Sequence, residues 1–441
     1  MTKRIMNVSI FKSLCAIAVV ALFMVQDLTA QSVRAGSVYS RFGIGEIQAF
    51  HSSQAAGMGG GGYALSSGRY KTFANPASWS NQLLTGVAGG LSYEGLTIDD
   101  GSSDVSRVGS GSLNSIQFGF PIKERRIGVG LSFAPFTRVG YDIRLLDQLD
   151  GSTATGDSAN YTIDYLGNGG LHSFTSGLGF AVGERLSFGI SSDFIFGLLE
   201  ESRETNFVDP SFSPTRLTQA TRLSGLRATI GAQGNLSNVA KDGDRLTAGI
   251  TFTTPTTLNG NRTNVFGTTQ DRDTLGTSID ASVSLPIGFA AGLGYTVDSR
   301  WVLVSDLVYQ PWTNFESQTS LPGYTPGSTV GLRDRIRLSA GAEVLPAGRD
   351  VFAPYWERVA YRLGFFYDQG YISPDGVNDV NTIGITAGLS VPMGVPGTRV
   401  DITTEVGRRG QTQNGLVRDT FFKFGLNLNI GERWFVKRKL G

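Results

Sequence analysis

Residues 282–295 read SVSLPIGFAAGLGY, and large apolar residues alternate with small or polar ones along this stretch. The apolar set consists of Val283, Leu285, Ile287, Phe289, Ala291, Leu293 and Tyr295. The other set consists of Ser282, Ser284, Pro286, Gly288, Ala290, Gly292 and Gly294. Because successive side chains of a strand point to opposite faces, the pattern predicts a strand whose apolar residues all share one face.

The same alternation recurs from residue 83 to the end of the chain, for example in Thr382–Met393. Fourteen segments of this kind are expected at about 83–96, 112–121, 126–142, 158–182, 184–206, 216–236, 243–261, 274–297, 300–316, 331–345, 357–373, 379–394, 397–411 and 417–433. Connectors after odd-numbered segments tend to be long and polar, such as 143–157, whereas those after even-numbered segments tend to be tight, such as 123–125. An even count with this asymmetry is typical of outer-membrane barrels.

A β-sandwich would also alternate, so the two architectures must be separated by other features. Many segments exceed ten residues, whereas a typical strand has about five or six. Their polar face carries Gly, Ser and Thr rather than Lys and Glu, which suits a crowded interior, and glycine reaches 59 of 441 residues. The sequence therefore predicts an all-β fold, a transmembrane antiparallel β-barrel of about 14 strands in the cell outer membrane.

The first residues have the features of a secretory signal. Lys3 and Arg4 are followed by an apolar run over 14–25 and by small residues at 28–30, so residues 1–30 are expected to form a signal peptide. The sole cysteine lies inside this segment, so no disulfide or thiol chemistry is expected after export. No later run approaches the ~18 apolar residues of a membrane helix, which argues against insertion as helices.

Residues 36–82 contain nine glycines and no sustained alternation. A fourteen-strand barrel encloses a lumen too wide for its own side chains to fill. We therefore expect residues 31–82 to form an N-terminal hatch inside the lumen of a barrel spanning residues 83–435. Residues 436–441 would be a basic C-terminal tail.

Known catalytic and metal motifs fit this chain poorly. Gly57, Gly59 and Gly62 match G-x-G-x-x-G but lack the flanking strand and helix of a nucleotide site, so tight backbone packing is the better interpretation. The two histidines, His51 and His172, lack a nucleophile elbow and zinc-ligand spacing. Lys and Arg number 38 against 37 Asp and Glu, which gives no sign of nucleic-acid binding. No catalytic residue, metal or cofactor is expected, and the protein is not expected to be an enzyme.

Charged residues alternate with apolar ones in two late segments, and this spacing directs them into the lumen. They are Arg333, Arg335, Arg337 and Glu343 in one segment and Arg399, Asp401 and Glu405 in the other. Two interpretations are open. The charges form ion pairs that hold the hatch, or they bind the head group of an amphipathic ligand.

Three stretches resemble the FadL/TodX family of outer-membrane transporters for long-chain fatty acids and aromatic hydrocarbons. Residues 285–315, LPIGFAAGLGYTVDSRWVLVSDLVYQPWTNF, are similar to late strands of that family, and residues 361–371, YRLGFFYDQGY, resemble its next strand. Asn75, Pro76 and Ala77 resemble the Asn-Pro-Ala of the family's hatch. The resemblance implies fourteen strands, a hatch, and passive uptake of hydrophobic molecules.

Two functions follow as expectations. The first is passive uptake of long-chain fatty acid-like or aromatic compounds. The alternative is a FadL-like structural or secretion-associated shuttle barrel that transports no small molecule. An apolar lumen cavity would favour the first function, and a solid, ion-paired lumen the second. Expected partners are the lipid bilayer of the outer membrane, a hydrophobic ligand and the outer-membrane assembly machinery.

The segment over 126–142 contains Pro135 in the sequence Ala-Pro-Phe. Proline lacks the N–H that a ladder needs, so it is found at edges or bulges. A closed barrel has no edges, so we expect Pro135 to break pairing locally or to lie at the rim. The family resemblance places an inward kink in this strand, and a lateral exit for ligand is therefore expected at Pro135.

Overall fold

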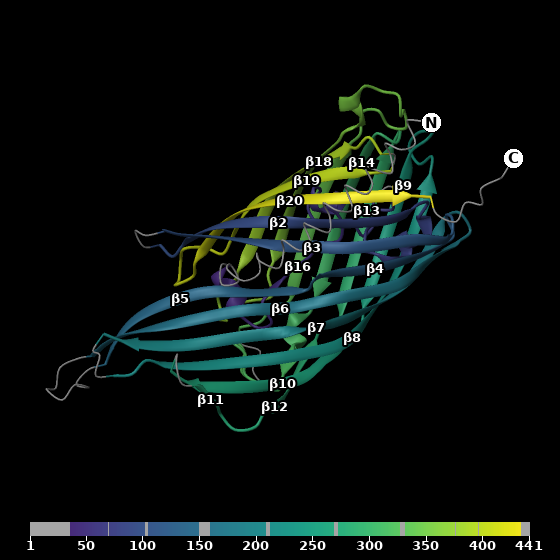
Figure 1. Cartoon of the computed structure of the whole chain (residues 1–441). Helices are drawn as coiled ribbons and strands as arrows, with labels where there is room; N and C mark the ends of the chain where they lie inside the picture. Colours follow the sequence, from purple (N-terminus) through teal and green to yellow (C-terminus); the bar gives the residue numbers. More distant parts are fainter. Residues whose placement is uncertain are drawn as a thin grey trace, which may run out of the picture.

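In the computed structural model the strands form one continuous antiparallel sheet that closes on itself, as Figure 1 shows. The first barrel strand pairs with the last, from Thr85↔Glu432 to Asp99↔Arg418, which completes the cylinder. The structure describes residues 36–433 apart from 69, 102–104, 150–158, 209–211, 269–271, 327–330, 375 and 396. The predicted signal peptide and basic tail lie outside the described residues.

The strands are β1 (Glu46–Ile47), β2 (Thr85–Asp99), β3 (Val105–Lys123), β4 (Ile127–Pro135), β5 (Thr137–Leu149), β6 (Ala159–Val182), β7 (Leu186–Phe207), β8 (Thr215–Ser237), β9 (Arg245–Thr253), β10 (Thr256–Gly267), β11 (Arg272–Thr274), β12 (Ile279–Leu285), β13 (Gly288–Val297), β14 (Trp301–Gln310), β15 (Glu316–Ser317), β16 (Arg335–Val344), β17 (Ala360–Gln369), β18 (Asn381–Pro392), β19 (Arg399–Arg409) and β20 (Arg418–Glu432). The helices are η1 (Val38–Arg41), α2 (Ser53–Ala56), η2 (Pro76–Asn81), η3 (Trp312–Asn314) and η4 (Tyr355–Arg358).

The prediction of about fourteen strands is confirmed, because the described chain forms a closed 14-strand antiparallel barrel. Several short strands are halves of one crossing: β4 continues into β5, β9 into β10 and β12 into β13. Short turns at 124–126, 183–185 and 298–300 join strands at one end. In outer-membrane barrels this is the periplasmic end, and the end with long loops is extracellular.

A belt of exposed apolar side chains covers the outer surface in the half of the barrel nearer the short turns. It includes Val87, Leu91, Phe180, Ile190, Ile250, Leu293, Leu307, Leu363, Ile385 and Leu426. Among the described residues, no helix is long and apolar enough to cross a membrane. An outward apolar belt on a closed barrel is the arrangement that lipid requires, and it places the protein in the outer membrane.

The expectation that the apolar residues of 282–295 share one face is wrong. Val283 and Leu285 are buried inside the barrel, whereas Phe289 and Leu293 are 43 % and 56 % exposed on its outer surface. The reason is Pro286, which lies between β12 and β13 where the ladder is interrupted. One additional residue at such an interruption shifts the alternation and turns the following side chains to the other face.

The neighbouring crossing has a matching break between β9 and β10, at Thr254 and Pro255. On β9 the odd-numbered residues, such as Thr251, point inward, whereas on β10 the even-numbered residues, such as Leu258, point inward. Beyond this level the polarity of the wall is inverted. Outer positions such as Asn259 and Asn261 are polar and exposed, and apolar side chains point inward.

These inward apolar side chains form one cluster in the extracellular half of the barrel, which we call the extracellular apolar cluster. Its members include Ile44, Val139, Tyr141, Leu171, Ile195, Leu258, Val283, Trp312, Phe315 and Tyr371. Burial of this many apolar side chains gives this half a solid core similar to that of a soluble domain.

Candidate functional site

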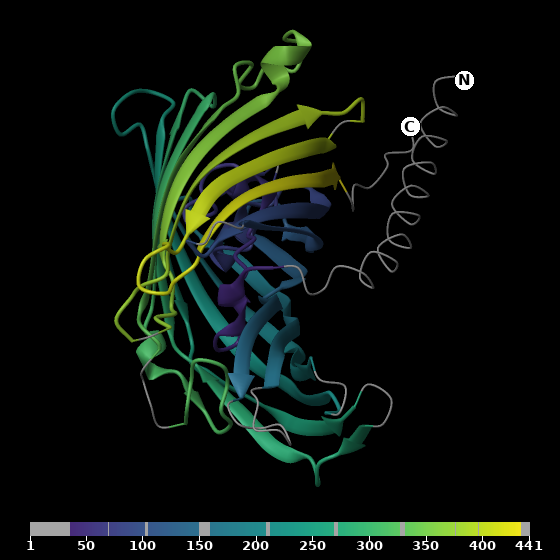
Figure 2. The ribbon, with the colours of Figure 1, turned by 90° about the vertical axis from the view of Figure 1, so that its left-hand side faces the viewer.

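Residues 36–84, which we call the N-terminal segment, lie inside the barrel and contain η1, β1, α2 and η2 (Figure 2, purple). The segment packs along β3, β4, β5, β6, β7 and β8 and along β18 and β19. Its side chains include fully buried Ile44, Met58 and Trp79. The lumen around this segment is the candidate functional site, because every predicted role of the protein depends on whether it is open.

The predicted motif Asn75-Pro76-Ala77 begins η2. The Asn75 Oδ1 accepts a hydrogen bond from the Ala77 N–H at 3.0 Å, which caps the helix. The Asn75 Nδ2 donates to the carbonyl oxygens of Ala232 and Ile250 in the wall, at 3.1 and 3.2 Å. One buried side chain therefore both starts the helix and fixes it to β8 and β9.

Glycines in the wall allow η2 to approach this closely. A Cβ at Gly189 on β7 would lie 2.3 Å from the carbonyl carbon of Pro76, and one at Gly231 on β8 would lie 2.1 Å from Asn75 Oδ1. No side chain fits at these distances, so the glycines allow backbone to pack directly against backbone.

A buried ion-pair group, the Arg362 cluster, holds α2. Arg362 Nε lies 2.7 Å from Glu343 Oε2, and Arg362 Nη1 lies 3.4 Å from Asp401 Oδ1. The Ser53 hydroxyl donates to Asp401 at 2.5 Å, and Gln54 Nε2 donates to Glu343 at 3.1 Å. The Arg362 side chain is 0 % exposed; its Nε and Nη1 bind the wall and α2, whereas its Nη2 has no hydrogen-bond partner among the described residues.

A second group, the Asp368 cluster, binds the glycine-rich loop that follows α2. Asp368 Oδ2 accepts from Arg335 at 2.6 Å and from Arg337 at 3.0 Å. Arg337 Nη2 then donates to the Gly59 carbonyl oxygen at 2.9 Å, and its guanidinium lies 4.1 Å from the centre of the Phe366 ring. Arg337 therefore fastens the loop, and Arg335 holds the Asp368 carboxylate beside it.

The glycine-rich loop wraps a carboxylate of the barrel. Asp306 on β14 accepts hydrogen bonds from the Gly62 and Tyr63 N–H groups, at 2.8 and 2.9 Å. Gly59 and Gly62 have φ of +88° and +111°, which only glycine adopts without strain. The G-x-G-x-x-G match therefore serves to hold the segment to the wall, with an aspartate where a nucleotide loop would hold phosphate.

Two further groups lie nearer the extracellular end. Arg409 on β19 pairs with Glu46 of β1 and lies 3.9 Å from Asp419, which also accepts from the Ser37 hydroxyl. Segment and wall are thus joined by charges of both signs at several levels of the lumen.

The last group joins wall strands to each other. Glu94 on β2 accepts from Arg138 of β5 at 2.5 Å and lies 3.4 Å from Lys423 Nζ on β20. Lys423 Nζ also lies 3.9 Å from Glu405, one of the predicted lumen charges. Arg138 therefore reaches across from β5 to β2.

The contact of Arg138 with Glu94 matters because strand pairing in the wall is interrupted beside Pro135. Pairing of β4 with β3 ends at Phe133↔Ile116, and Pro135 is the last residue of β4. The Phe136 N–H donates to Leu171 on β6, so by alternation the missing N–H of Pro135 would face β3. Within the described chain no pairing joins β5 to β3, and the two diverge in Figure 1.

The N-terminal segment covers this interruption. Glu46 and Ile47 of β1 pair with Arg138 and Thr137 at the edge of β5. Further along, the Ser40 hydroxyl accepts from the Gly140 N–H and donates to the Gly140 carbonyl oxygen, each at 3.0 Å. The part of the β5 edge nearest Pro135, from Thr137 to Gly140, is therefore paired from inside the lumen.

Two cavities lined by described residues lie beside the N-terminal segment, with volumes of about 140 and 190 Å³. Both are lined by Arg335 and Arg337, and the smaller also by Glu46 and Asp368. The larger cavity is also lined by apolar side chains, among them Phe50, Pro135 and Phe136, so charged and apolar residues share its lining.

His51 borders the larger cavity and stays neutral. Burial, and then the positive charges of Arg337 and Arg335, lower its pKa to about 4. Its Nε2 lies 3.5 Å from the Tyr63 hydroxyl, and its carbonyl oxygen accepts from Gln117 at 3.0 Å. Protonation of His51 would place a third positive charge beside two arginines, so acid disfavours this arrangement.

Comparison with known proteins identifies the family. The model of the BamG family matches residues 10–441, nearly the whole chain. The chain belongs to the BamG family. A comparison with curated proteins found no match.

Solved structures with the same architecture include two toluene transporters. TbuX of Ralstonia pickettii has a TM-score of 0.55 at 15 % identity, over 87 % of this chain and 99 % of that one. TodX of Pseudomonas putida has a TM-score of 0.52 at 15 % identity, over 89 % and 100 %. At such identity the likeness shows the fold, and the resemblance to the FadL/TodX family is confirmed.

The predicted lumen charges of this BamG-family barrel are distributed over its height. Arg335, Arg337, Glu343 and Asp401 belong to the two clusters that hold the N-terminal segment. Glu405 lies nearer the extracellular end, beside Lys423.

The two remaining predicted arginines lie at the ends of the barrel. Arg333 precedes β16 on the loop side, where it donates to the Gly370 carbonyl oxygen and pairs with Asp379. Arg399 begins β19 on the turn side and donates to Ser390 Oγ at 2.7 Å.

Sequence reasoning missed several charges that fasten the N-terminal segment. Arg362 and Asp368 share a face of β17 with small Gly364, so the alternation over 360–369 contained the signal. Asp306 is the one charged residue of β14, and no sequence pattern indicated its role, because its partners are backbone N–H groups of a distant loop.

Proposed function

We propose that this BamG-family protein is a closed FadL-type barrel with a structural or secretion-associated role, and that it does not conduct hydrophobic small molecules. The observation that carries the proposal is the docking of the N-terminal segment by buried ion pairs, with Arg362 at the centre. Removing one partner of such a pair leaves an unpaired buried charge, so this arrangement resists opening.

The shape of the lumen supports the same conclusion. A ligand pocket is usually apolar and about 300–1,000 Å³. The two lumen cavities described above measure about 140 and 190 Å³, which is below this range, and each is lined by both charged and apolar side chains. In the extracellular half, the inward apolar side chains pack against one another in one buried cluster.

As partners we propose the bilayer and the outer-membrane assembly machinery. No catalytic role is proposed. Among the described residues, no group of three or more His, Cys, Asp or Glu is placed to hold a metal.

The test is purification of the full-length protein from native outer membranes after mild crosslinking. We expect assembly-machinery subunits to be recovered with it, and depletion of the protein to lower the amounts of other barrels. Recovery of the protein alone, together with loss of fatty-acid uptake on depletion, would overturn the proposal.

The second candidate is the passive uptake of fatty acid-like or aromatic compounds with lateral exit at Pro135. It is favoured by the interrupted pairing between β5 and β3, since a gap in the wall would let an apolar ligand pass into lipid without crossing water. Each CH₂ returned to water would cost about 0.8 kcal/mol. On this candidate, ligand would have to displace β1 and Ser40 from the β5 edge.

A further inference from the structure

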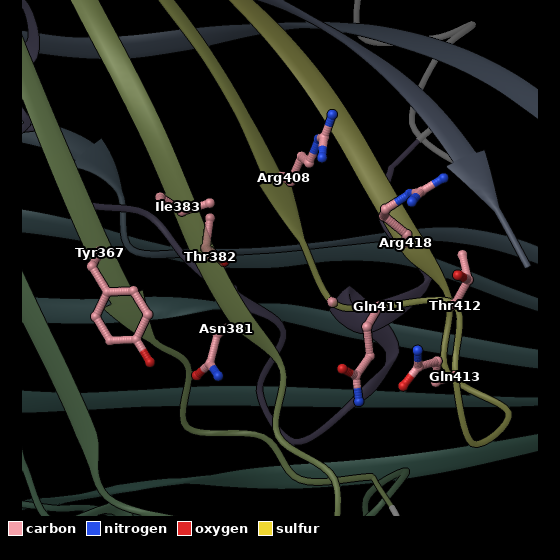
Figure 3. Close-up of a pocket in the computed structure, with 10 residues that line it drawn as sticks. Tyr367, Asn381, Thr382, Ile383, Arg408, Gln411, Thr412, Gln413 and Arg418 are labelled. Carbon is pink, nitrogen blue, oxygen red and sulfur yellow. The ribbon is translucent and has the colours of Figure 1, made fainter.

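A pocket of about 420 Å³ lies on the outer surface at the extracellular ends of β17 to β20, away from the lumen (Figure 3). Tyr367 and Arg408 flank Ile383 in the pairing of β17, β18 and β19. Ile383 and Arg408 are exposed, whereas Arg409, the next residue, is buried in the lumen, so the row faces outward. Gln411 and Gln413 of the β19–β20 loop line the extracellular side.

The pocket lies where the apolar belt ends. Toward the short turns, the outward positions are Phe365, Ile385, Val406 and Phe422, all exposed. Toward the loops, the outward positions become Arg408 and polar residues of the β19–β20 loop. The pocket is therefore at the level of lipid head groups in the outer leaflet, where aromatic and basic residues are favoured.

The lining presents hydrogen-bond donors and contains no carboxylate. The Arg408 side chain has no ion-pair or hydrogen-bond partner among the described residues. Arg418 pairs with Asp99 through Nη2 and keeps 41 % of its side chain exposed. Asn381 accepts from Arg333 through Oδ1, which leaves its NH₂ group as the free end.

Two guanidinium groups that line one pocket match a phosphate group, because arginine binds phosphate through paired, charge-assisted hydrogen bonds. Figure 3 shows Arg408 and Arg418 on adjacent strands, with their guanidinium groups directed to the same side. Exposed Ile383 lies between Tyr367 and Arg408, and exposed Phe422 lies nearer the short turns; both would contact acyl chains.

We propose that this pocket binds the phosphorylated head group of an outer-leaflet lipid, with Arg408 as the principal contact and Arg418 as the second. The site is separate from the lumen, and it holds whether or not the barrel conducts. A bound lipid at β17–β20 would fix the tilt and depth of the barrel on the side opposite β6 and β7.

The experiment uses the purified full-length protein in detergent, titrated with bisphosphorylated lipid A, with bound lipid counted by native mass spectrometry. Arg408→Gln leaves the Arg418–Asp99 pair intact, and the double variant with Arg418→Gln removes both charges. Arg185→Gln in the periplasmic turn at 183–185 is the matched control, because it removes an exposed arginine far from the pocket. Heat-modifiable mobility on gels verifies folding of each variant.

We expect lipid A retention to fall about tenfold in the double variant, as for the loss of two charge-assisted contacts, with a smaller loss in Arg408→Gln. Arg185→Gln should retain lipid A as the wild type does, and an unphosphorylated lipid should bind all variants equally weakly. Equal retention by the double variant would overturn the proposal. Displacement of lipid A by millimolar inorganic phosphate alone would also overturn it, because the site would then be for a free anion.

Discussion

Arg362 is the single residue on which the docking of the N-terminal segment depends most. Its guanidinium satisfies Glu343 and Asp401, and its Nη1 also donates to the Ser53 carbonyl oxygen at 3.4 Å. We expect Arg362→Met to lower the free energy of unfolding by about 3–5 kcal/mol, because two carboxylates would remain buried without a cation. Urea titration of the barrel in detergent measures this.

The control is Arg144→Met on β5. Arg144 pairs with Asp164 at 2.6 Å, but its side chain is 67 % exposed. Solvent screens the Arg144 end of that pair, and Asp164, whose side chain is 10 % exposed, keeps a hydrogen bond from Asn206 at 3.3 Å, so a smaller change is expected. Arg362→Lys keeps the charge and should recover part of the loss. If Arg362→Met unfolded at the same urea concentration as the Arg144 variant, the Arg362 cluster would not hold the segment.

His51 gives the lumen a dependence on pH. Its pKa is lowered to about 4 in the folded protein, against an ordinary value of 6.5. The unfolded chain therefore binds a proton more readily, and folding stability falls as pH drops from about 6.5 toward 4. We expect a loss of about 2 kcal/mol between pH 7 and pH 4.5 that is absent in His51→Gln, measured by urea titration at both values. The same pH dependence in both proteins would contradict this account.

At the residue scale, alternation in the sequence predicts that charges of β16 and β19 point inward, because a wall strand has a strict period of two. It could not identify their partners. Glu46 and Ser53 belong to a segment without periodicity, and their contacts with Arg409 and Asp401 depend on how that segment folds back into the lumen.

Among the elements, η2 depends on the absence of side chains in the wall beneath it. We expect Gly189→Ala to displace η2 and lower stability by about 1–3 kcal/mol, because the new Cβ would overlap the backbone of Pro76. Gly234→Ala is the matched control, since its nearest neighbour, Leu186 Cδ2, lies at 3.6 Å. Thermal unfolding followed by circular dichroism compares the two, and equal melting temperatures would show that η2 does not rest on Gly189.

The strand pair β4–β5 tests the second candidate function. Pro135→Val would supply an N–H on the β3 side and extend the ladder. If ligand leaves through this interruption, uptake of radiolabelled oleate should slow in the variant while barrel assembly is unchanged. Undiminished uptake in a folded Pro135→Val barrel would exclude lateral exit at this position.

Strand positions were predictable because apolar alternation is imposed by lipid on one side. The exchange of inward and outward faces at Pro286 and Pro255 was not predictable, because the residues beyond each break keep an apparently continuous alternation. Val283 and Phe289 occupy positions of the same parity, and only the interruption between β12 and β13 places them on opposite faces. A proline inside a long alternating run is the available signal for such a break.

The whole molecule is a barrel whose two halves along the barrel axis differ in polarity. The half of the barrel nearer the short turns has an apolar outer surface and an ion-paired lumen. The extracellular half has a polar outer surface and the extracellular apolar cluster inside. The N-terminal segment passes through both, since Ile44 lies in the apolar cluster and Ser53 in the Arg362 cluster. The fold is shared with hydrocarbon channels, so on the proposed function the filling of the lumen, and not the wall, would distinguish this protein from an open channel.

The most direct test of a closed lumen is the ionic conductance of the purified protein in planar bilayers, compared with a variant that lacks residues 36–82. The account predicts that the full-length barrel gives no stable channel openings and that the deletion variant gives large ones. Stable openings of the full-length protein, or equal conductance in the two proteins, would contradict the claim that the N-terminal segment closes the barrel.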